Sequence, residues 1–198
     1  MPASILLRTE RLTLRRFVEA DAELLYALDE DPEVRRWVHA GPPDLRRIRE
    51  VVLPRLLSYY ARYPQWGFWA AEEGPARAFV GWFHLRPAPG HSGRGLGTGQ
   101  GGEEPLELGY RLRRDAWGRG LATEGSRALL RWASQEHGAT RIEAVTLIGN
   151  RASQRVLEKA GFARVEEFVY EPPPWAEVPT DPHSRRSYRY VWQAGPEA

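Results

Sequence analysis

The stretch that most constrains this chain lies between residues 105 and 138, where an alternating apolar segment leads through a basic, glycine-containing turn into an amphipathic helix. From residue 113 it reads Arg-Arg-Asp-Ala-Trp-Gly-Arg-Gly-Leu-Ala-Thr-Glu. Two glycines one residue apart let the backbone approach a ligand closely, and a helix start presents unpaired N–H groups and the positive end of its dipole. The stretch therefore indicates a site for an anion such as a pyrophosphate. A strand-to-helix turn that uses glycine only for its dihedral angles is the alternative.

Composition narrows the class of protein. Apolar residues make up 42% of the 198 residues, which is typical of a globular chain, and this length suits one domain. Cysteine is absent, so disulfides, zinc-thiolate sites, iron–sulfur clusters and thiol nucleophiles are excluded. The five histidines lack a His-x-x-x-His spacing, and we predict no bound metal. No signal sequence and no apolar run of about eighteen residues is present, so we expect a cytoplasmic protein without a membrane partner.

The charge pattern argues against a direct nucleic-acid partner. The formal net charge is only +2, and the basic residues are spread through the chain rather than gathered in one segment. Residues 87–104 are rich in glycine, but no lysine followed by serine or threonine completes a P-loop. We therefore expect this segment to be a mobile loop inside a single domain that spans residues 1–198.

Hydrophobic periodicity predicts an alternation of strands and helices. Strands are expected at 9–17, 66–73, 76–86, 105–112, 141–148, 163–170 and 187–192, and helices at 18–30, 44–63, 121–138 and 150–160. Pro54 should kink or break the second helix, because proline lacks the backbone N–H that a helix interior needs. The strand-helix-strand units of the second half imply right-handed crossovers in a mixed sheet.

Four motifs, taken in their order along the chain, carry a family resemblance. They are Thr-Glu-Arg-Leu-Thr-Leu-Arg from Thr9, Glu-Leu-Gly-Tyr-Arg-Leu from Glu107, Trp-Gly-Arg-Gly-Leu-Ala-Thr-Glu from Trp117, and Asn-Arg-Ala-Ser-Gln-Arg-Val-Leu-Glu-Lys-Ala-Gly-Phe from Asn150. The chain resembles the GNAT superfamily of acyl-CoA-dependent N-acyltransferases, and within it the branch of the ribosomal-protein N-terminal acetyltransferases RimJ and RimL. The resemblance implies an α/β (α+β) fold with a twisted, mixed, mostly antiparallel sheet of about seven strands and about four flanking helices. It also implies a V-shaped split between the fourth and fifth strands.

The resemblance assigns the glycine turn to acetyl-CoA. The superfamily's phosphate signature fits best at residues 117–122, although Trp117 stands where glutamine or arginine is usual. Backbone amides do most of the holding in such a loop, so the departure weakens the match more than the chemistry. The residues whose amides would bind the pyrophosphate are Gly118, Arg119, Gly120, Leu121, Ala122 and Thr123. The backbone of Tyr110, Arg111 and Leu112 would pair with the pantetheine arm.

Two further positions are implied at the start of the last helix. Asn150 precedes the helix 150–160, where asparagine commonly caps a helix N-terminus, and in the family the matching asparagine also bonds the pantetheine arm. Many superfamily members place a tyrosine at the position of Leu157 to protonate the departing thiolate. In the RimJ and RimL branch a serine at the position of Ser153 is the suggested substitute, which makes Ser153 a candidate for both cofactor binding and acid catalysis.

Glu107 is the first candidate for a general base. It stands in the strand that lines the implied cleft, and alternation turns it away from the face of Leu108 and Tyr110. The alternatives are a water chain as the base and an ordinary exposed strand glutamate. Tyr110 could support the reacting group or belong to the core.

The resemblance thus implies an N-acetyltransferase that transfers the acetyl group of acetyl-CoA directly to a primary amine. A protein N-terminus and a small-molecule amine are both acceptor candidates. A non-catalytic acyl-CoA-binding or regulatory module is the alternative function. The oligomeric state stays open, and a homodimer is compatible with the sequence.

Overall fold

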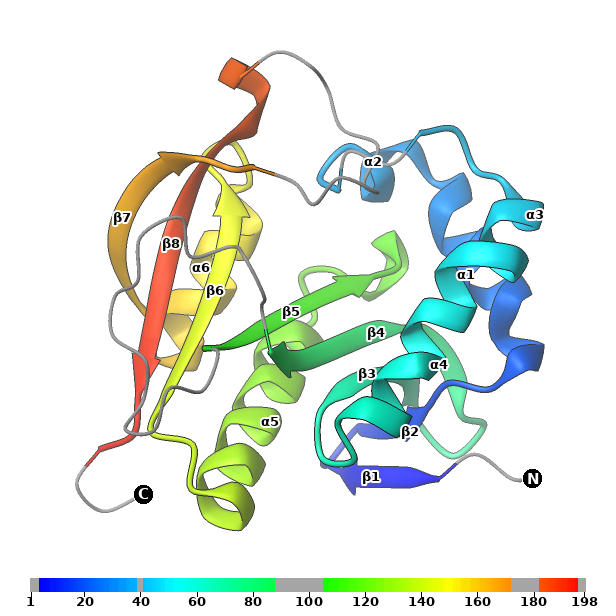
Figure 1. Ribbon diagram of the computed structural model, residues 1–198, viewed down its shortest axis with the longest axis horizontal. Helices are drawn as coiled ribbons and strands as arrows, with labels where there is room; N and C mark the ends of the chain where they lie inside the picture. Colours follow the sequence, from blue (N-terminus) through cyan, green and yellow to red (C-terminus); the bar gives the residue numbers. More distant parts are fainter. Residues whose placement is uncertain (1–3, 39–40, 88–104, 172–181, 196–198) are drawn as a thin grey trace.

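The computed structural model describes residues 4–38, 41–87, 105–171 and 182–195, and its centre is one eight-stranded sheet (Figure 1). The strands are β1 (Ile5–Arg8), β2 (Leu12–Arg16), β3 (Gly67–Glu73), β4 (Ala78–Pro87), β5 (Leu106–Leu112), β6 (Arg141–Leu147), β7 (Ala163–Val169) and β8 (Arg186–Gln193). Their order is β1-β2-β3-β4-β5-β6-β8-β7. Neighbouring strands are antiparallel except β5 and β6, which are parallel. The expected mixed, mostly antiparallel sheet is confirmed.

Helices cover both faces of the sheet. They are α1 (Ala22–Glu30), α2 (Pro32–Arg35), α3 (Leu45–Arg47), α4 (Leu53–Arg62), α5 (Leu121–His137) and α6 (Arg151–Ala160). Trp69 and Phe83 pack with the apolar faces of α5 and α6, whereas Phe68 and Ala70 pack with α1 and α4. Because alternate residues of a strand point to opposite faces, the two apolar clusters lie on opposite sides of β3 and β4. In the part of the chain that the structure describes, every helix is too short or too polar to cross a bilayer.

The sheet splits between β5 and β6. These strands pair only at Leu106 with Ile142 and at Glu107 with Glu143, and then they diverge (Figure 1). On its other side, β5 pairs with β4 along its whole length. Among the described residues, none pairs as a strand with residues 108–112 on the side of β6. This divergence confirms the V-shaped split that the resemblance placed between the strands at 105–112 and 141–148.

The structure corrects the first strand. The prediction of one strand over residues 9–17 was wrong at its start, because residues 5–16 form the hairpin of β1 and β2. Thr9 makes the turn between them: its N–H donates to the carbonyl oxygen of Leu12 (2.8 Å), and its hydroxyl accepts from the Leu12 N–H (2.9 Å). The sheet therefore has eight strands instead of about seven.

The break predicted at Pro54 is confirmed in a specific form. The helix before it changes to a π-helical turn at η2 (Ile48–Val52), and α4 begins with Pro54 in its first turn. A wider turn ahead of the proline accommodates a residue that cannot donate the usual backbone hydrogen bond. Of the glycine-rich segment 87–104, only Pro87 at the end of β4 lies within the described residues.

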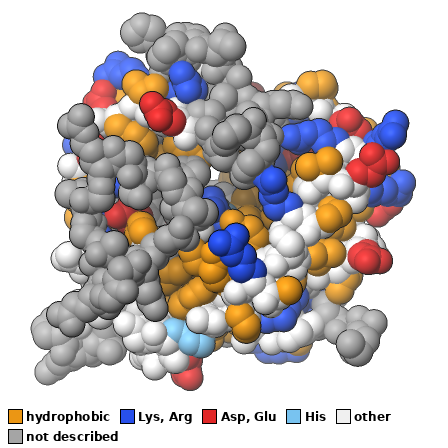
Figure 2. Space-filling view, viewed as in Figure 1, with side chains coloured by type: hydrophobic (Ala, Val, Ile, Leu, Met, Phe, Trp, Pro, Cys, Tyr) orange, Lys and Arg blue, Asp and Glu red, His pale blue; other side chains and the backbone are white. Residues whose placement is uncertain are grey.

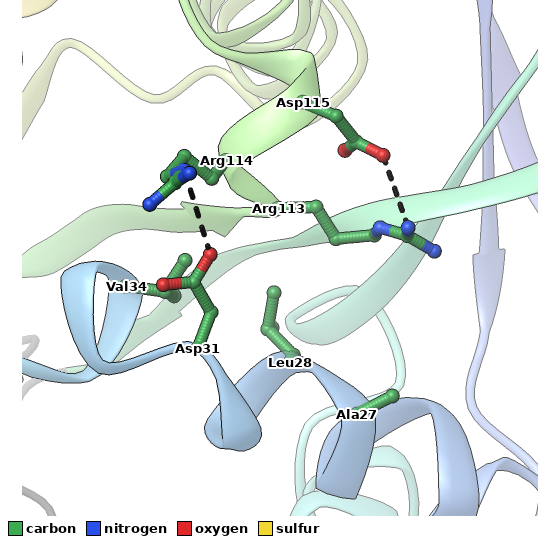
Figure 3. Close-up of a pocket in the computed structure, with 7 residues that line it drawn as sticks. All are labelled: Ala27, Leu28, Asp31, Val34, Arg113, Arg114 and Asp115. Carbon is green, nitrogen blue, oxygen red and sulfur yellow. Dashed lines mark hydrogen bonds and ion pairs between the residues drawn. The ribbon is translucent and has the colours of Figure 1, made fainter.

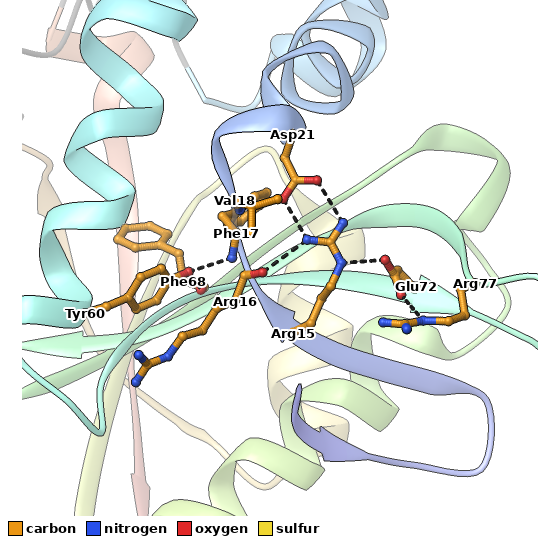
Figure 4. A network of polar contacts seen from close by, with 9 residues as sticks. All are labelled: Arg15, Arg16, Phe17, Val18, Asp21, Tyr60, Phe68, Glu72 and Arg77. Carbon is orange, nitrogen blue, oxygen red and sulfur yellow. Dashed lines mark hydrogen bonds and ion pairs between the residues drawn. The ribbon is translucent and has the colours of Figure 1, made fainter. Parts of the chain in front are cut away.

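A buried polar network ties α1 to the sheet (Figure 4). The Arg15 guanidinium of β2 donates to both carboxylate oxygens of Asp21 (2.7 and 2.8 Å) and to Glu72 of β3 (2.5 Å). Arg77 donates to the second oxygen of Glu72 (2.6 Å). The Arg15, Asp21 and Glu72 side chains are each less than 10% exposed. This network fixes the start of α1 over one face of β2 and β3.

Candidate active site

The glycine turn after β5 has the conformation of an anion-binding loop. Gly118 and Gly120 adopt left-handed backbone angles, with φ of 71° and 82°, which are costly for residues with a side chain. Gly120 precedes α5, and no side chain in the described ranges caps this helix start. The first bond of the helix joins the Glu124 N–H to the Gly120 carbonyl oxygen (3.0 Å). The N–H groups of the preceding turn therefore have no partner within the helix and fit a bound pyrophosphate.

Two side chains of this loop turn away from the amides. The Trp117 indole N–H donates to the Leu112 carbonyl oxygen at the end of β5 (2.9 Å). The Arg119 guanidinium forms a two-pronged ion pair with Glu73 of β3 (3.0 and 2.6 Å). Trp117 thus fixes the loop to the strand before it, which gives the unusual first residue of the signature a structural role. Arg119 is left with its backbone amide as the group that can reach a ligand.

The free edge of β5 is formed by alternate residues. The Arg113 N–H donates to the carbonyl oxygen of Val80 in β4 (2.9 Å). Two residues earlier along β5, Arg111 lies opposite Trp82 of β4. In an antiparallel pair, backbone groups alternate between the two sides of a strand. The backbone groups of Tyr110 and the N–H of Leu112 therefore point into the split, where an extended arm could pair with them. The Arg111 backbone faces β4.

The Arg111 side chain has its own partner. It forms an ion pair with Asp29 of α1, and both side chains are less than 20% exposed. Burial lowers the pKa of Arg111 and raises that of Asp29, because both charged forms are removed from water. This pair joins α1 to β5 on the face opposite α5.

Tyr110, Ser153 and Asn150 meet across the split. The Asn150 side-chain oxygen accepts the Ser153 N–H (3.0 Å), which confirms the predicted helix cap. The Ser153 hydroxyl lies 2.9 Å from the Tyr110 hydroxyl, which also donates to the Ser153 carbonyl oxygen (3.3 Å). Burial raises the pKa of Tyr110, although the hydrogen bond with Ser153 opposes this effect. Tyr110 is therefore protonated at neutral pH and links β5 to the start of α6.

Glu107 lies on the other face of β5 and is mostly buried. One carboxylate oxygen is 3.2 Å from Nε2 of His84 and 3.2 Å from Nη2 of Arg86, both in β4. Its side chain is 14% exposed, so it is not an ordinary exposed strand glutamate. The His84 imidazole lies directly over Gly109, where a Cβ would come within 2.6 Å of the ring. The glycine of the Glu-Leu-Gly-Tyr motif makes room for this imidazole.

The sequence did not single out His84 and Arg86. The signal that could have found them is the alternation of the strand at 76–86, which places both residues on the face opposite Phe83 and Leu85. Burial disfavours the charged Arg86 guanidinium, but the Glu107 charge together with Tyr59 and Tyr170 outweighs this effect and raises the Arg86 pKa. Glu107 and Arg86 therefore place a carboxylate and a cation side by side at the end of the split where β5 and β6 pair.

Aromatic rings wall this polar group. Trp82 stacks on His84 with ring centroids 5.7 Å apart, and Phe68 meets His84 edge-on at 5.1 Å. Tyr59 meets Phe68 edge-on at 5.2 Å. Burial raises the pKa of Tyr170, which follows β7, and the nearby Glu107 charge adds to this. Figure 2 shows hydrophobic side chains gathered near the centre of this view, with Lys and Arg side chains among them.

A cavity of about 150 Å³ lies beside the site, where α1 and α2 meet the turn after β5 (Figure 3). The residues that line it are Ala27, Leu28, Asp31, Val34, Arg113, Arg114 and Asp115. Its charges face one another: Arg113 pairs with Asp115 (3.0 Å), and Arg114 with Asp31 (3.8 Å). We assign no ligand to it. Within the described ranges, no group of three or more His, Asp or Glu side chains could hold a metal ion.

A split mixed sheet with an anion-binding loop after the strand at the split defines the class of acyl-CoA-dependent acetyltransferases. Residues 11–163 match the family described as "Acetyltransferase (GNAT) domain". The chain belongs to this family, and it is an N-acetyltransferase that uses acetyl-CoA as its acyl donor.

Relatives support this assignment. The chain is 33% identical over 172 residues to the "FsC-acetyl coenzyme A-N(2)-transacetylase" of Aspergillus fumigatus. The aligned region covers 85% of this chain and 70% of the relative. A GNAT-family acetyltransferase from Bacillus anthracis has a similar structure, with a TM-score of 0.72, 20% identity, and coverage of 94% and 97% of the two chains. The aminoglycoside acetyltransferase AAC(6')-Ib in complex with coenzyme A has a TM-score of 0.65 at 22% identity, with coverage of 92% and 94%. The two structural matches show the fold.

Proposed function

We propose that the chain transfers the acetyl group of acetyl-CoA directly to a primary amine that binds beside Glu107. The observation that carries this proposal is the position of the Glu107 carboxylate. It lies on the same strand as the free backbone edge, and that strand leads into the anion-binding loop. Donor and acceptor would thus meet at β5, and such alignment of reactants is worth about 7–11 kcal/mol of the barrier.

The reaction needs a proton acceptor. The neutral amine attacks the thioester carbon, the tetrahedral intermediate collapses with cleavage of the C–S bond, and one proton leaves the nitrogen. At pH 7 an α-amino group with a pKa of about 8 is roughly one-tenth neutral, whereas a lysine amine with a pKa of about 10.4 is almost fully charged. In our proposal Glu107 takes the proton, directly or through water, and His84 and Arg86 hold its carboxylate in place.

The departing thiolate needs a proton donor. Leu157, at the position where many superfamily members have a tyrosine, is 2% exposed and packs in the core, so it leaves no hydroxyl there. We assign the donor role to Ser153, because its hydroxyl lies next to the split and beside the protonated Tyr110. In this arrangement Tyr110 orients the Ser153 hydroxyl. Gly118 to Thr123 would hold the pyrophosphate through their amides, and Asn150 would fix the start of α6 and offer its side-chain nitrogen to the arm.

The acceptor in this proposal is a primary amine. The name of the Aspergillus relative describes transfer to a nitrogen, N(2), which supports an amine acceptor. Two acceptor classes are tested. One is a protein N-terminus, as in the RimJ and RimL branch, and the other is a small-molecule amine.

The test is a turnover screen. Wild-type protein is mixed with acetyl-CoA and a panel of peptides with free N-termini, lysine, polyamines and aminoglycosides, and the released thiol is measured. Because the chain has no cysteine, a thiol-specific reagent detects the released CoA and nothing from the protein. We expect acceptor-dependent thiol release and an acetylated product of the matching mass. Tight acetyl-CoA binding without turnover across the whole panel would favour a non-catalytic acyl-CoA-binding module and reject the proposal.

A further inference from the structure

The start of α5 is attached to the first β-hairpin through Glu124. This carboxylate, in the first turn of the helix, accepts hydrogen bonds from the Thr9 hydroxyl (2.5 Å), the Arg11 N–H (3.0 Å) and the Arg11 Nε (2.7 Å). Nη2 of Arg11 lies 2.5 Å from Oε2, the same oxygen that accepts from Nε, whereas the other two bonds are accepted by Oε1. Residues that are more than 110 positions apart in the sequence therefore converge on one carboxylate.

The same arginine reaches the glycine loop. Nη1 of Arg11 donates to the Arg119 carbonyl oxygen (2.9 Å), which lies between the two left-handed glycines. Nη2 lies 3.5 Å from the place where a Cβ on Gly120 would be. Glu73 binds the Arg119 side chain from β3. The loop is therefore fixed at the Arg119 carbonyl oxygen and at the Arg119 side chain, and neither contact uses a loop N–H group.

The charges explain why the arginine is needed. A carboxylate in the first turn of a helix is stabilised by the helix dipole, but it would repel a phosphate bound at the same helix start. Burial acts to raise the pKa of Glu124, but hydrogen bonds from Thr9 and Arg11 outweigh it and hold the pKa below its usual value. Glu124 therefore keeps its negative charge at neutral pH. Arg11 neutralises this charge within direct contact.

We propose that Thr9, Arg11 and Glu124 form a clamp that positions the glycine loop for the pyrophosphate of acetyl-CoA. None of the three needs to touch the donor: they are positioning residues that act through the loop amides and through charge neutralisation. The clamp also gives a role to Thr9 and Arg11 of the first motif, which lie in the turn between β1 and β2, and to the glutamate that ends the motif beginning at Trp117. The inference rests on the proposed pyrophosphate role of the loop.

The experiment compares two donors. Acetyl-CoA carries the pyrophosphate, whereas acetyl-pantetheine has the same thioester and arm without it. In Arg11→Ala, we expect kcat/KM for acetyl-CoA to fall by roughly tenfold, the size of a lost charge-assisted hydrogen bond. We expect kcat/KM for acetyl-pantetheine to stay within about twofold of the wild-type value. Glu124→Ala should behave in the same way, and Thr9→Val should show a smaller loss because it removes one hydrogen bond.

A matched control removes an arginine elsewhere. Arg46→Ala deletes the same charge from an ion pair with Glu50 on the exposed surface, where the arginine side chain is 83% exposed. It should leave both donors unaffected. Thermal melting checks that each variant is folded, and calorimetry measures binding of CoA itself without a need for turnover.

The outcomes separate the clamp from the proposed function. Equal losses for both donors would show that the three residues only stabilise the fold, and unchanged values for both would show that the loop does not need them; either result overturns the clamp. If the wild type binds CoA but acetylates nothing, the proposed function fails, and the clamp is still decided by whether Arg11→Ala weakens CoA binding more than pantetheine binding.

Discussion

Gly109 offers a way to move His84 without removing a chemical group. A Cβ at position 109 would lie 2.6 Å from both Cε1 and Nε2 of His84, whereas non-bonded heavy atoms keep about 3.5–4.0 Å apart. In Gly109→Ala the imidazole must therefore shift by about 1 Å, and its 3.2 Å contact with Glu107 would open to roughly 4 Å, beyond hydrogen-bonding distance. Gly109 is not among the described glycines with left-handed backbone angles, so alanine adds no backbone strain.

The expected result is a kinetic defect confined to turnover. A misplacement of about 1 Å at a reacting group can cost roughly 100-fold, and we expect kcat of Gly109→Ala to fall between about 10-fold and 100-fold. KM for acetyl-CoA should not change, because the donor edge of β5 is formed by other residues. Steady-state thiol release, with acetyl-CoA varied at a saturating acceptor concentration, measures both kcat and KM for acetyl-CoA. Gly195→Ala is the matched control, since a Cβ there meets nothing within 4 Å.

A double variant tests the reasoning. If alanine at position 109 acts by displacing the imidazole, it should have no further effect in a His84→Ala background, where the space over residue 109 is empty. The reasoning is refuted if Gly109→Ala lowers kcat by the same factor with and without His84. It is also refuted if kcat stays at the wild-type level.

Three other perturbations probe separate parts of the molecule. Ser153→Ala should lower kcat by about tenfold or more with an unchanged KM for acetyl-CoA, as expected for a lost proton donor; unchanged kcat would remove Ser153 from the mechanism. Glu72→Ala leaves the Arg15 charge buried with one partner fewer and should lower the free energy of unfolding in urea by about 3 kcal/mol, whereas Arg46→Ala should change it by less than about 0.5 kcal/mol. Burial raises the pKa of Tyr60 to about 12, so the folded protein holds this proton more tightly than the unfolded chain, and the stabilisation is complete below pH 10. It should be lost as the pH rises from about 10 to 12, by roughly 2–3 kcal/mol in denaturant titrations, and Tyr60→Phe should flatten this dependence.

Local signals in the sequence were sufficient for most of the fold. Gly138 and Gly161 end α5 and α6 in left-handed conformations, with φ of 66° and 98°, as expected for helix C-termini. Alternation located the strands and turned Glu107 away from the face of Leu108. Each of these features depends on residues within a few positions of one another, which is why periodicity and capping rules could predict them.

The features that were not predicted depend on contacts between distant segments. The short strand β1 depends on its pairing with β2, and its four residues carry too little alternation to be recognised alone. His84 reaches Glu107 because β4 and β5 pair in one particular register. Arg11 and Glu124 are 113 positions apart, and nothing in either local stretch indicates the other. The candidate loop and the candidate base could therefore be located from sequence. The side chains that hold the loop, and those that hold the base, could not.

The short β5–β6 pairing has a mechanical consequence. Only two residue pairs join these strands, and one of them contains Glu107, so this pairing is the joint at which the two halves of the sheet meet. If the angle between the two halves of the sheet changes, the Glu107 carboxylate lies near the axis of that rotation. It should move little, whereas the strands on either side of the split should move more. A donor whose arm pairs with the free edge of β5 would lie between β5 and β6 and would fix the angle between the two halves of the sheet. Amide hydrogen exchange at Tyr110 and Leu112 should then slow when CoA binds.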